Sequence, residues 1–438
     1  MNSIDRRQHP VPGPHLRRCL RAIPRRAGFL MLGLLAAVAC DRPVTGPDQE
    51  LDGAEAAAAR AAAGAANAPP RRAAQGALVG WNETARERVA LHATSPPLAS
   101  RVYALLGLAQ LDALTRLRVA PSPGRPGRAG SGSAESAAVS AASAAVLAHL
   151  YPDEAEELMA RAGSDPAPSG PRGRPPEDLS SAIAIGEAAA AAVIEEAATD
   201  GSDAVWDGSI PTRSGIWFSS LDPPQPPLLP LWGSVRPWLM ESGSQFRSPA
   251  PPVFGSPEFL SALAEVRRFS DTRTAEQQRI AEFWADGAGT YTPPGHWNEI
   301  AAELIVGYRL GALRAARVFA YMNMALMDAG IACWEAKFTY WLIRPSQVDP
   351  EIWLAVGLPN FPAYTSGHSA FSGAASEVLG HFFPAERRRL RALAEEAAIS
   401  RIYGGIHYRF DSDRGLEQGR AVARLAIERA RADAPLWR

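Results

Sequence analysis

The stretch from Lys337 to Asp411 decides how this 438-residue chain folds and which chemistry it can support. It contains KFTYWLIRP (residues 337–345), TSGH (365–368) and SRIYGGIHYRFD (400–411). Lys337 is the one lysine among 45 basic residues, since every other cation is an arginine. A lone lysine in an arginine-rich chain indicates a place that needs a compact ammonium group rather than a planar guanidinium.

From this stretch we single out three cations (Lys337, Arg344 and Arg401) and two histidines (His368 and His407), a combination suited to a tetrahedral oxyanion. Lys337 and Arg344 are seven residues apart, so on one helix they would share a face, about 10.5 Å apart along the axis. Aromatic and aliphatic residues surround both, and a cation in such surroundings needs a buried partner. The alternative is a solvated helix face that carries two cations.

The second segment, Ser366-Gly367-His368, precedes an amphipathic run. Ser366 is predicted to cap a helix there, and free N–H groups at a helix start attract anions. Gly367 would let the backbone approach a ligand closely. By itself this tripeptide is a weak signal, and its weight comes from the neighbouring motifs.

The third segment joins Arg401, His407 and Asp411. Gly404-Gly405 predicts a turn after Arg401, which would change the direction in which the His407 side chain points. Asp411 lies four residues after His407 and could orient its imidazole through a hydrogen bond. His381, at the end of a predicted helix, is interpreted as structural.

The whole chain is predicted to be all-α, because no stretch alternates in the manner of a strand. Its hydrophobic content of 47% is enough for a sizeable core. Residues 201–256 are rich in proline and predicted to be an irregular excursion, which either helps to close a substrate entrance or wraps the fold on its own aromatic residues. Helices are predicted at 82–117 (broken at Pro96-Pro97), 134–162, 178–199, 256–268, 274–285, 297–328, 330–343, 367–383, 385–400 and 412–432.

The N-terminus has the pattern of an export signal. Residues 1–26 are basic, and a short apolar run over 27–39 follows, too short for a stable membrane span. The run ends in Ala37-Val38-Ala39-Cys40, similar to the lipidation site of bacterial lipoproteins. A lipid-anchored, exported protein is therefore expected, with an ordinary secretory signal as the alternative.

Charge and cysteine content argue against nucleic-acid binding and against a disulfide framework. The net charge is −1, and residues 1–39 contribute +6, so the remainder carries −7 and is not expected to bind nucleic acid. The three cysteines give no disulfide framework, and Cys333 is interpreted as a buried apolar residue. The predicted regions are 1–39 (signal), 40–79 (disordered tether), 80–255 (N-terminal helices with the excursion 201–255) and 256–438 (catalytic helices).

Together, the three segments resemble the signature shared by vanadium-dependent haloperoxidases and the type-2 phosphatidic acid phosphatase (PAP2) superfamily. The first part of the signature is a Lys followed, after six residues, by Arg-Pro, and Lys337 to Pro345 match it. The third part is Ser-Arg, then a His after five residues and an Asp after three more, and Ser400 to Asp411 match it. Thr365 replaces the proline of Pro-Ser-Gly-His, which alters loop stiffness but removes no ligand. The resemblance implies a large helical bundle of the vanadium haloperoxidase and acid phosphatase type.

Further matches favour the haloperoxidase branch. A Trp three residues before the motif Lys and a Phe seven before the motif His are thought to line the halide site, and Trp334 and Phe361 hold these positions. The family also has an upstream Asp-Gly followed by Thr-Pro-Pro, and Asp286-Gly287 before Thr292-Pro293-Pro294 resembles it. In the family this Asp pairs with the Arg of the third motif. Aromatic core packing is the alternative for Trp334 and Phe361.

The resemblance implies a cofactor and roles for the site residues. Vanadate would be held by Lys337, Arg344, Ser366, Gly367 and Arg401, with His407 bonded to the metal and His368 as acid/base. Hydrogen peroxide, a halide and an organic acceptor would be the substrates. In the alternative, a soluble phosphatase, phosphate occupies the pocket, His407 is the nucleophile, Asp411 orients it and His368 protonates the leaving group. An envelope protein that only binds an oxyanion is a third hypothesis. Neither the choice of halide nor the oligomeric state follows from the sequence.

Overall fold

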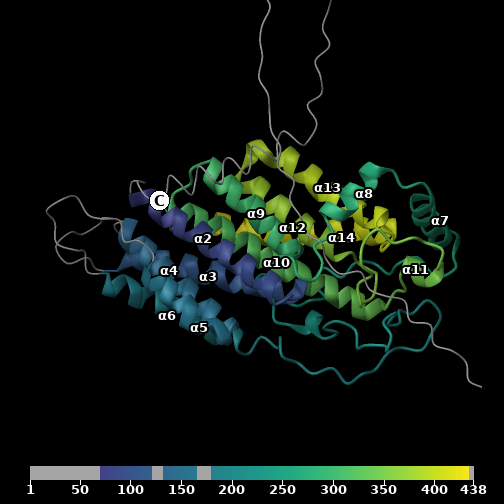
Figure 1. Ribbon diagram of the computed structural model, residues 1–438, viewed down its shortest axis with the longest axis horizontal. Helices are drawn as coiled ribbons and strands as arrows, with labels where there is room; N and C mark the ends of the chain where they lie inside the picture. Colours follow the sequence, from purple (N-terminus) through teal and green to yellow (C-terminus); the bar gives the residue numbers. More distant parts are fainter. Residues whose placement is uncertain (1–69, 121–131, 165–178, 434–438) are drawn as a thin grey trace, which may run out of the picture. The chain divides into compact units, whose positions relative to one another are not determined.

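The computed structural model describes residues 70–120, 132–164 and 179–433, and within them the chain is helical. The export segment, Cys40 and the predicted tether up to residue 69 lie outside these residues. The prediction of an all-α fold is confirmed, since the described residues contain no strand beyond an isolated bridge between Ile216 and Leu342. The helices (Figure 1) are α2 (Pro70–Leu91), α3 (Pro96–Val119), α4 (Gly132–Leu150), α5 (Ala155–Ser164), α6 (Ser180–Ala197), α7 (Pro257–Thr272), α8 (Ala275–Phe283), α9 (Thr292–Gly307), α10 (Ala312–Tyr340), α11 (Pro345–Val348), α12 (Gly367–Phe382), α13 (Arg387–Tyr403) and α14 (Arg409–Ala432).

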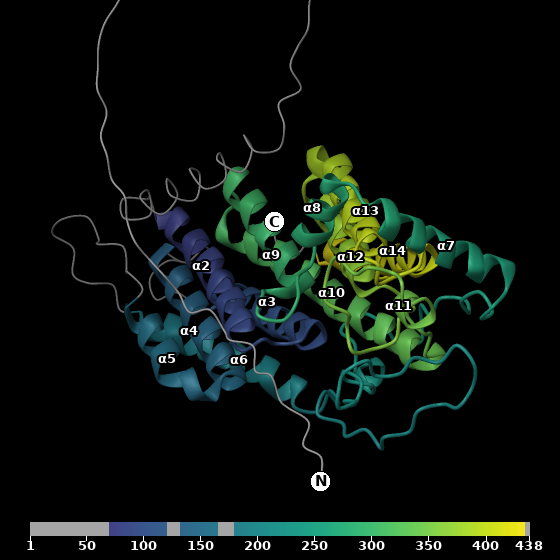
Figure 2. The ribbon, with the colours of Figure 1, turned by 45° about the vertical axis from the view of Figure 1, so that its right-hand side comes forward.

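Helix α10 is the central element. It spans 29 residues, and every residue from Val318 to Trp334 is buried. A helix that is buried on all sides must be covered all round, and α3, α12 and α14 pack against it. Figure 2 shows α10 between the N-terminal helices α2 to α6 and the C-terminal helices α12 to α14. Regions 80–255 and 256–438 therefore contribute to one hydrophobic core.

Close approach of α12 and α14 brings the second and third motifs together. A Cβ on Gly419 of α14 would collide with the carbonyl oxygen of Ala370 in α12. One turn earlier, a Cβ on Gly415 would meet the Ser366 carbonyl oxygen at 2.6 Å. Glycine at these two positions lets the helix backbones touch, which sets Ser366 beside the start of α14.

The excursion over 201–256 runs along α10 and the loop that follows it. Asp328 of α10 accepts hydrogen bonds from the backbone N–H groups of Trp238, Leu239 and Met240 at 2.8–2.9 Å. Further along α10, the Trp334 indole donates to the Leu228 carbonyl (3.1 Å). The segment is thus attached to α10, and its aromatic residues pack against the rest of the fold, Trp206 and Trp217 on Trp341 and Trp232 in the core.

Several helix boundaries differ from the predicted ones. The predicted helix 134–162 is broken between α4 and α5, where Pro152–Glu154 form a short 3-10 turn. Helix α2 begins at Pro70, so the tether does not extend to residue 79, because Ala74 and Leu78, one turn apart, are both buried in the core. The predicted helix 297–328 is instead broken at Arg309, which has a positive φ of 51°. Helix α10 is continuous through Gly330, where the predicted helices 297–328 and 330–343 meet, and a Cβ on Gly330 would come within 2.9 Å of the Phe371 ring. No helix in the described ranges is long and apolar enough to cross a membrane.

Candidate active site

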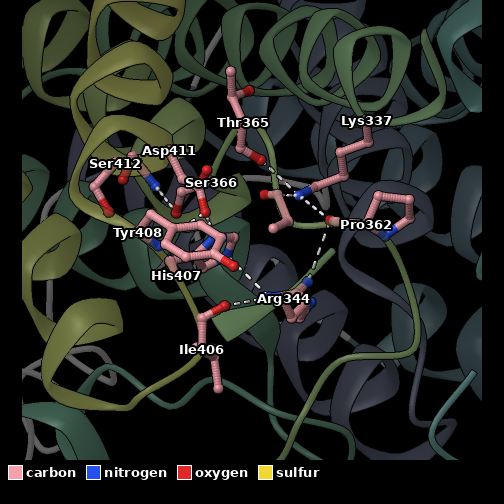
Figure 3. A network of polar contacts seen from close by, with 12 residues as sticks. Lys337, Arg344, Pro362, Thr365, Ser366, Ile406, His407, Tyr408, Asp411 and Ser412 are labelled. Atoms are coloured by element: carbon pink, nitrogen blue, oxygen red, sulfur yellow. Dashed lines mark hydrogen bonds and ion pairs between the residues drawn. The ribbon is translucent and has the colours of Figure 1, made fainter. Parts of the chain in front are cut away.

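The three sequence segments meet in one polar network (Figure 3). Lys337, near the end of α10, is fully buried, with 0% of its surface exposed. Its Nζ donates hydrogen bonds to the carbonyl oxygens of Pro362 (2.9 Å), Ala363 (2.9 Å) and Thr365 (2.5 Å). Burial lowers the pKa of this ammonium group, because an apolar interior disfavours its charge.

Arg344 reaches the same network from a different element than predicted. Helix α10 ends at Tyr340, and Trp341 has a positive φ of 54°, so the chain turns away before Arg344. The predicted helix face shared by Lys337 and Arg344 is therefore wrong. Arg344 Nε donates to the Phe361 carbonyl (2.9 Å), and Nη1 donates to the Ile406 carbonyl (2.8 Å). Burial lowers the pKa of Arg344 to about 9, which still leaves it charged at neutral pH.

Arg401, the third cation, lies near the end of α13 and is also buried. Its Nε donates to the Ser400 hydroxyl (2.9 Å), and Nη2 donates to the Ala281 carbonyl (2.7 Å). No described residue accepts a hydrogen bond from its Nη1. Burial lowers the pKa of Arg401 to about 10.

The positive charges of these three buried side chains are not paired with a negative charge on any described residue. Within the part of the chain that the structure describes, none of Lys337, Arg344 and Arg401 forms an ion pair. Backbone carbonyls take up some of their N–H groups, but carbonyl dipoles do not neutralise buried charge. A dianion placed between them would do so, and would also raise the lowered pKa of Lys337.

Ser366 and Gly367 stand at the start of α12. Ser366 caps this helix as predicted, its Oγ accepting from the Ser369 N–H (3.4 Å). A Cβ built on Gly367 would meet the Trp334 ring at 3.5 Å, an ordinary contact. The protein's own packing therefore leaves space for a side chain there. A ligand that approaches the Gly367 N–H would account for the glycine.

His407 is oriented by Asp411, as predicted. Its Nδ1 lies 2.9 Å from Asp411 Oδ2, and the same oxygen accepts from the Tyr408 N–H (3.0 Å). Gly405, with a φ of +80°, forms the turn between Arg401 and His407. Because Nδ1 donates to the carboxylate, Nε2 carries the lone pair, and it lies 3.4 Å from Arg344 Nη1. Burial, then Arg344 and Lys337, lower the pKa of His407 well below 6.5.

His368 follows Gly367 on the first turn of α12. Its Nε2 is a buried atom without a hydrogen-bond partner among the described residues. Burial lowers the pKa of His368 well below 6.5, and the charge of Arg401 adds to this effect. The ring is therefore neutral at neutral pH, and a buried nitrogen without a partner marks a place for a ligand atom.

The partner of Asp286 differs from the one that the family resemblance implies. It forms no ion pair with Arg401 in the described structure; instead both of its carboxylate oxygens lie 3.2 Å from Nδ1 of His296. Asp286 is still close enough for its charge to raise the pKa of Arg401. The implied Asp286–Arg401 pair is therefore replaced by Asp286–His296.

Trp334 and Phe361 form one aromatic wall. Their ring centroids are 5.0 Å apart, and Lys337 Nζ lies 5.7 Å from the Trp334 ring and 5.0 Å from the Phe361 ring. The Arg344 guanidinium is also 5.0 Å from the Phe361 ring. Both aromatic residues thus contact the cations of the site, where the resemblance places them.

Two groups at the site were missed by the sequence interpretation. The first is the set of carbonyls between Phe361 and Thr365, whose orientation depends on backbone geometry that no residue type specifies. The second is His296, one of eight histidines, which stands two residues after the quoted Thr292-Pro293-Pro294. His381, interpreted as structural, contacts the Phe382 ring and lies outside the network.

The described residues define an all-α protein in which the three motif segments contribute three buried cations and two histidines whose pKa values are lowered by burial. Comparison with known proteins agrees. A family model described as the VCPO second helical-bundle domain matches residues 384–434. The vanadium chloroperoxidase of Curvularia inaequalis is 31% identical over 146 residues, which are 26% of this chain and 24% of that protein. The aligned part thus spans about a quarter of that relative's length.

Solved structures extend the likeness to the whole fold. A bacterial vanadium-dependent iodoperoxidase superposes with a TM-score of 0.68 at 25% identity, over 81% of this chain and 96% of that one. A bacterial vanadium-dependent chloroperoxidase in its holo form superposes with a TM-score of 0.65 at 16% identity, over 78% and 93%. The resemblance to vanadium haloperoxidases that the three motifs indicate is confirmed, and the helical bundle is of their type.

Proposed function

We propose that this chain is a vanadate-dependent haloperoxidase, which oxidises a halide with hydrogen peroxide to a hypohalous species that halogenates organic acceptors. The observation that carries the proposal is the set of three buried cations, Lys337, Arg344 and Arg401, that form no ion pair among the described residues, with Nε2 of His407 3.4 Å from Arg344 Nη1. Such a pocket suits a tetrahedral dianion. The aromatic pair Trp334 and Phe361 beside it supports halide oxidation.

The residues present fit vanadate. The oxyanion oxygens would be held by Lys337, Arg344, Arg401, the Ser366 hydroxyl and the Gly367 N–H, and His407 Nε2 would bond the metal. When bound, vanadate would supply a metal centre that activates hydrogen peroxide toward attack by halide, and the oxidation state of the vanadium would stay the same. The protein contributes positive charge fixed in advance around the reacting oxygens, usually the largest catalytic effect.

His368 is the acid/base group of the proposal. Its ring is neutral at neutral pH, because burial lowers its pKa, and its Nε2 lacks a partner among the described residues. A neutral imidazole can accept a proton from hydrogen peroxide as the peroxide enters, and can later return it. The lowered pKa keeps the ring ready for this step.

The aromatic wall is proposed to contact the halide. We expect Trp334→Ala and Phe361→Ala each to raise the halide concentration needed for half-maximal rate about tenfold, because apolar walls desolvate the halide beside the cations. Steady-state rates at varied bromide and iodide test this. Unchanged halide dependence in both variants would mean that the two rings only pack in the core.

One assay separates the candidate functions. The full chain is incubated with orthovanadate, peroxide, a halide and a phenol acceptor, beside a phosphate-ester hydrolysis assay without vanadate. Halogenation that requires vanadate supports the proposal, whereas hydrolysis alone would favour a phosphohistidine phosphatase. Binding of the oxyanion with neither reaction would favour the binding protein. His407→Ala should abolish whichever reaction is found, and full activity in that variant would contradict the site.

We also propose that the protein is exported and anchored at Cys40. The basic segment 1–26, the apolar run and the small residues before Cys40 support this. Incorporation of a labelled fatty acid in wild type, and its loss in Cys40→Ala, is the expected result. A labelled Cys40→Ala protein would contradict the anchor.

A further inference from the structure

A cavity of about 290 Å³ lies on the proline-rich excursion. Its lining comes from two stretches of that segment, within 201–206 and 226–235. Trp206 and Trp232 give it aromatic walls, and three prolines and two leucines supply much of the rest. Pro226, one of the lining residues, is exposed, so the cavity opens to solvent. A small ligand can therefore enter it without unfolding of the segment.

The second of these stretches is bonded to the aromatic wall of Trp334 and Phe361. The Leu228 carbonyl accepts from the Trp334 indole (3.1 Å). Asn360, the residue before Phe361, donates from Nδ2 to the Pro226 carbonyl (2.8 Å), and its own carbonyl accepts from the Leu228 N–H (3.0 Å). The lining of the cavity and the proposed halide site are thus joined by three hydrogen bonds.

The chemistry of the lining favours a neutral aromatic ring. None of the described residues that line the cavity carries a charge, so a carboxylate or phosphate would lose its hydration there without gaining an ionic partner. Tryptophan and proline side chains instead present rigid apolar surface on which an aromatic ring can pack. A cavity of about 150 Å³ is enough to hold benzene. The cavity on the excursion therefore has room for a ring system with substituents.

One buried donor in the lining is unused. Trp232 is 2% exposed, and its indole N–H has no acceptor among the described residues. A buried N–H group without a partner is uncommon and calls for an explanation. Leu229, three residues earlier in the lining, has a positive φ of 49°, a strained conformation of the kind that is found at ligand sites. A hydroxyl group on a bound ring would supply the missing acceptor.

We propose that this cavity binds the organic acceptor of the reaction, a neutral hydroxylated aromatic compound, so that the halogen is transferred to a ring held by the protein. The inference rests on the proposed haloperoxidase function, which supplies the hypohalous acid. In the transfer, a ring carbon bonds to the halogen as the oxygen–halogen bond breaks, and the displaced ring proton leaves with the hydroxide as water. A bound ring presents some of its positions to the hypohalous acid, whereas a free ring reacts at every activated position.

Binding is tested by equilibrium dialysis of 1-naphthol against the full chain, without peroxide or halide. Ala204 lines the cavity from an exposed position, so Ala204→Trp fills space without disturbing the core, and we expect it to weaken 1-naphthol binding at least tenfold. Ala192→Trp, at an exposed position on α6, is the matched control and should bind as wild type does. Naphthalene-1-sulfonate, which adds a negative charge to the same rings, should bind at least tenfold more weakly than 1-naphthol. Equal 1-naphthol binding in the two variants, or equal binding of the sulfonate and 1-naphthol, would overturn the inference.

The unused donor is tested separately. Trp232→Phe keeps an aromatic wall but removes the indole N–H, and we expect it to weaken 1-naphthol binding about fivefold, the worth of one neutral hydrogen bond. Naphthalene, which has no hydroxyl group, should bind equally to wild type and to this variant. Equal losses for the two compounds would contradict the recognition of a hydroxyl group.

The products test the role of the cavity in the reaction. With orthovanadate, peroxide and bromide, wild type should give a ratio of 2-bromo- to 4-bromo-1-naphthol at least threefold different from that given by free hypobromous acid. Ala204→Trp should return this ratio to that of the free reagent, and Ala192→Trp should keep the wild-type ratio. The ratio does not depend on how fast bromide is oxidised. The free-reagent ratio in wild type would contradict the acceptor role even if 1-naphthol binds.

Failure of this inference differs from failure of the proposed function. Vanadate-dependent bromination by wild type with the free-reagent ratio rejects only the acceptor site. No bromination by wild type, together with 1-naphthol binding that is lost in Ala204→Trp, supports an aromatic-binding cavity and rejects the haloperoxidase. Circular dichroism melting of each variant establishes that the protein under test is folded.

Discussion

At the scale of single residues, Lys337 is held by geometry that an arginine cannot reproduce. Its Nζ donates to three carbonyls and lies beside the rings of Trp334 and Phe361. A planar guanidinium cannot direct three donors from one atom to these carbonyls. We expect Lys337→Arg to weaken orthovanadate affinity at least tenfold and to lower the melting temperature, both measured on purified protein.

The control for this substitution is Arg389→Lys, which exchanges the same two residue types in an exposed ion pair with Glu386. Such pairs contribute about 0–1 kcal/mol, so little change is expected. Wild-type affinity in Lys337→Arg would mean that any cation serves at this position. The lone lysine would then be an accident of composition.

The pH dependence of stability follows from His407. Its pKa in the folded protein lies well below 6.5, so below pH 6.5 the unfolded chain binds a proton that the folded protein does not. Its contribution to stability is therefore present above pH 6.5 and is lost as the pH falls. We expect the free energy of unfolding to fall by up to about 1.4 kcal/mol per pH unit from this one group.

Denaturant unfolding between pH 7 and pH 5 measures this slope. His407→Gln cannot titrate and should give a shallower slope, whereas His149→Gln, at an exposed position on α4, should keep the wild-type slope. Saturating phosphate should also flatten the slope, since a dianion raises the pKa of His407. Equal slopes in wild type and His407→Gln would contradict the role of burial.

At the scale of elements, the sequence predicts which residues meet better than how the backbone brings them together. Lys337 and Arg344 do share a network, but the helix between them ends at Tyr340, since Trp341 adopts a left-handed conformation. Tryptophan carries no signal for such a turn, so periodicity alone could not place this end. Ser366, by contrast, was predictable as a cap because its side chain accepts the hydrogen bond of a free N–H group at the start of the helix.

The same contrast applies to the acidic residues. Asp411 was predictable as the partner of His407, because the two are neighbours in sequence and their bond is local. The resemblance implies Arg401 as the partner of Asp286, whereas the structure pairs Asp286 with His296, and the two donors lie on different elements. Choosing between them requires the positions of α9 and α13, and these depend on packing of the whole core.

Thr292, the first residue of α9, combines backbone strain with an unpaired group. It has a positive φ of 64°, is 1% exposed, and its hydroxyl has no partner among the described residues. Positive φ costs a residue with a Cβ roughly 1–2 kcal/mol, and a buried unpaired hydroxyl about 1–3 kcal/mol. We therefore expect Thr292→Gly to stabilise the protein by about 1 kcal/mol, net of the added chain entropy.

Chemical denaturation of Thr292→Gly beside Ala301→Gly tests this. Ala301 lies inside the same helix, where glycine should destabilise by at least about 1 kcal/mol. Opposite signs for the two glycines would support local strain at Thr292. A loss of stability in both would mean that the threonine methyl group contributes more through packing than its backbone costs.

At the scale of the molecule, the excursion over 201–256 is attached to α10 along the half of the helix that leads to the site. Asp328 holds the backbone of Trp238 to Met240, and Glu335, two turns later, pairs with Arg247. Between these two contacts, the Trp334 indole is bonded to Leu228. The excursion therefore helps to fix a ring of the aromatic wall, a role that its irregular sequence leaves open.

Asp328 is the strongest of these attachments. It is 0% exposed, and burial raises its pKa to about 6, although three N–H groups oppose this shift. Removing the carboxylate would leave three N–H groups without an acceptor, that of Met240 buried and those of Trp238 and Leu239 partly buried, and a buried one costs about 1–3 kcal/mol. We expect Asp328→Ala to lower the free energy of unfolding by at least about 3 kcal/mol and to speed proteolytic cleavage within 201–256.

Limited proteolysis with mapping of the first cut, together with hydrogen exchange of residues 236–249, measures the release of the excursion. The control is Glu335→Gln, which breaks the Arg247 pair at a partly exposed position and should cost about 1 kcal/mol or less. If the excursion fixes the aromatic wall, Asp328→Ala should also raise the halide requirement in the direction expected for Trp334→Ala. A first cut outside 201–256, with unchanged halide dependence, would show that the excursion is held by its own packing and that the site does not depend on it.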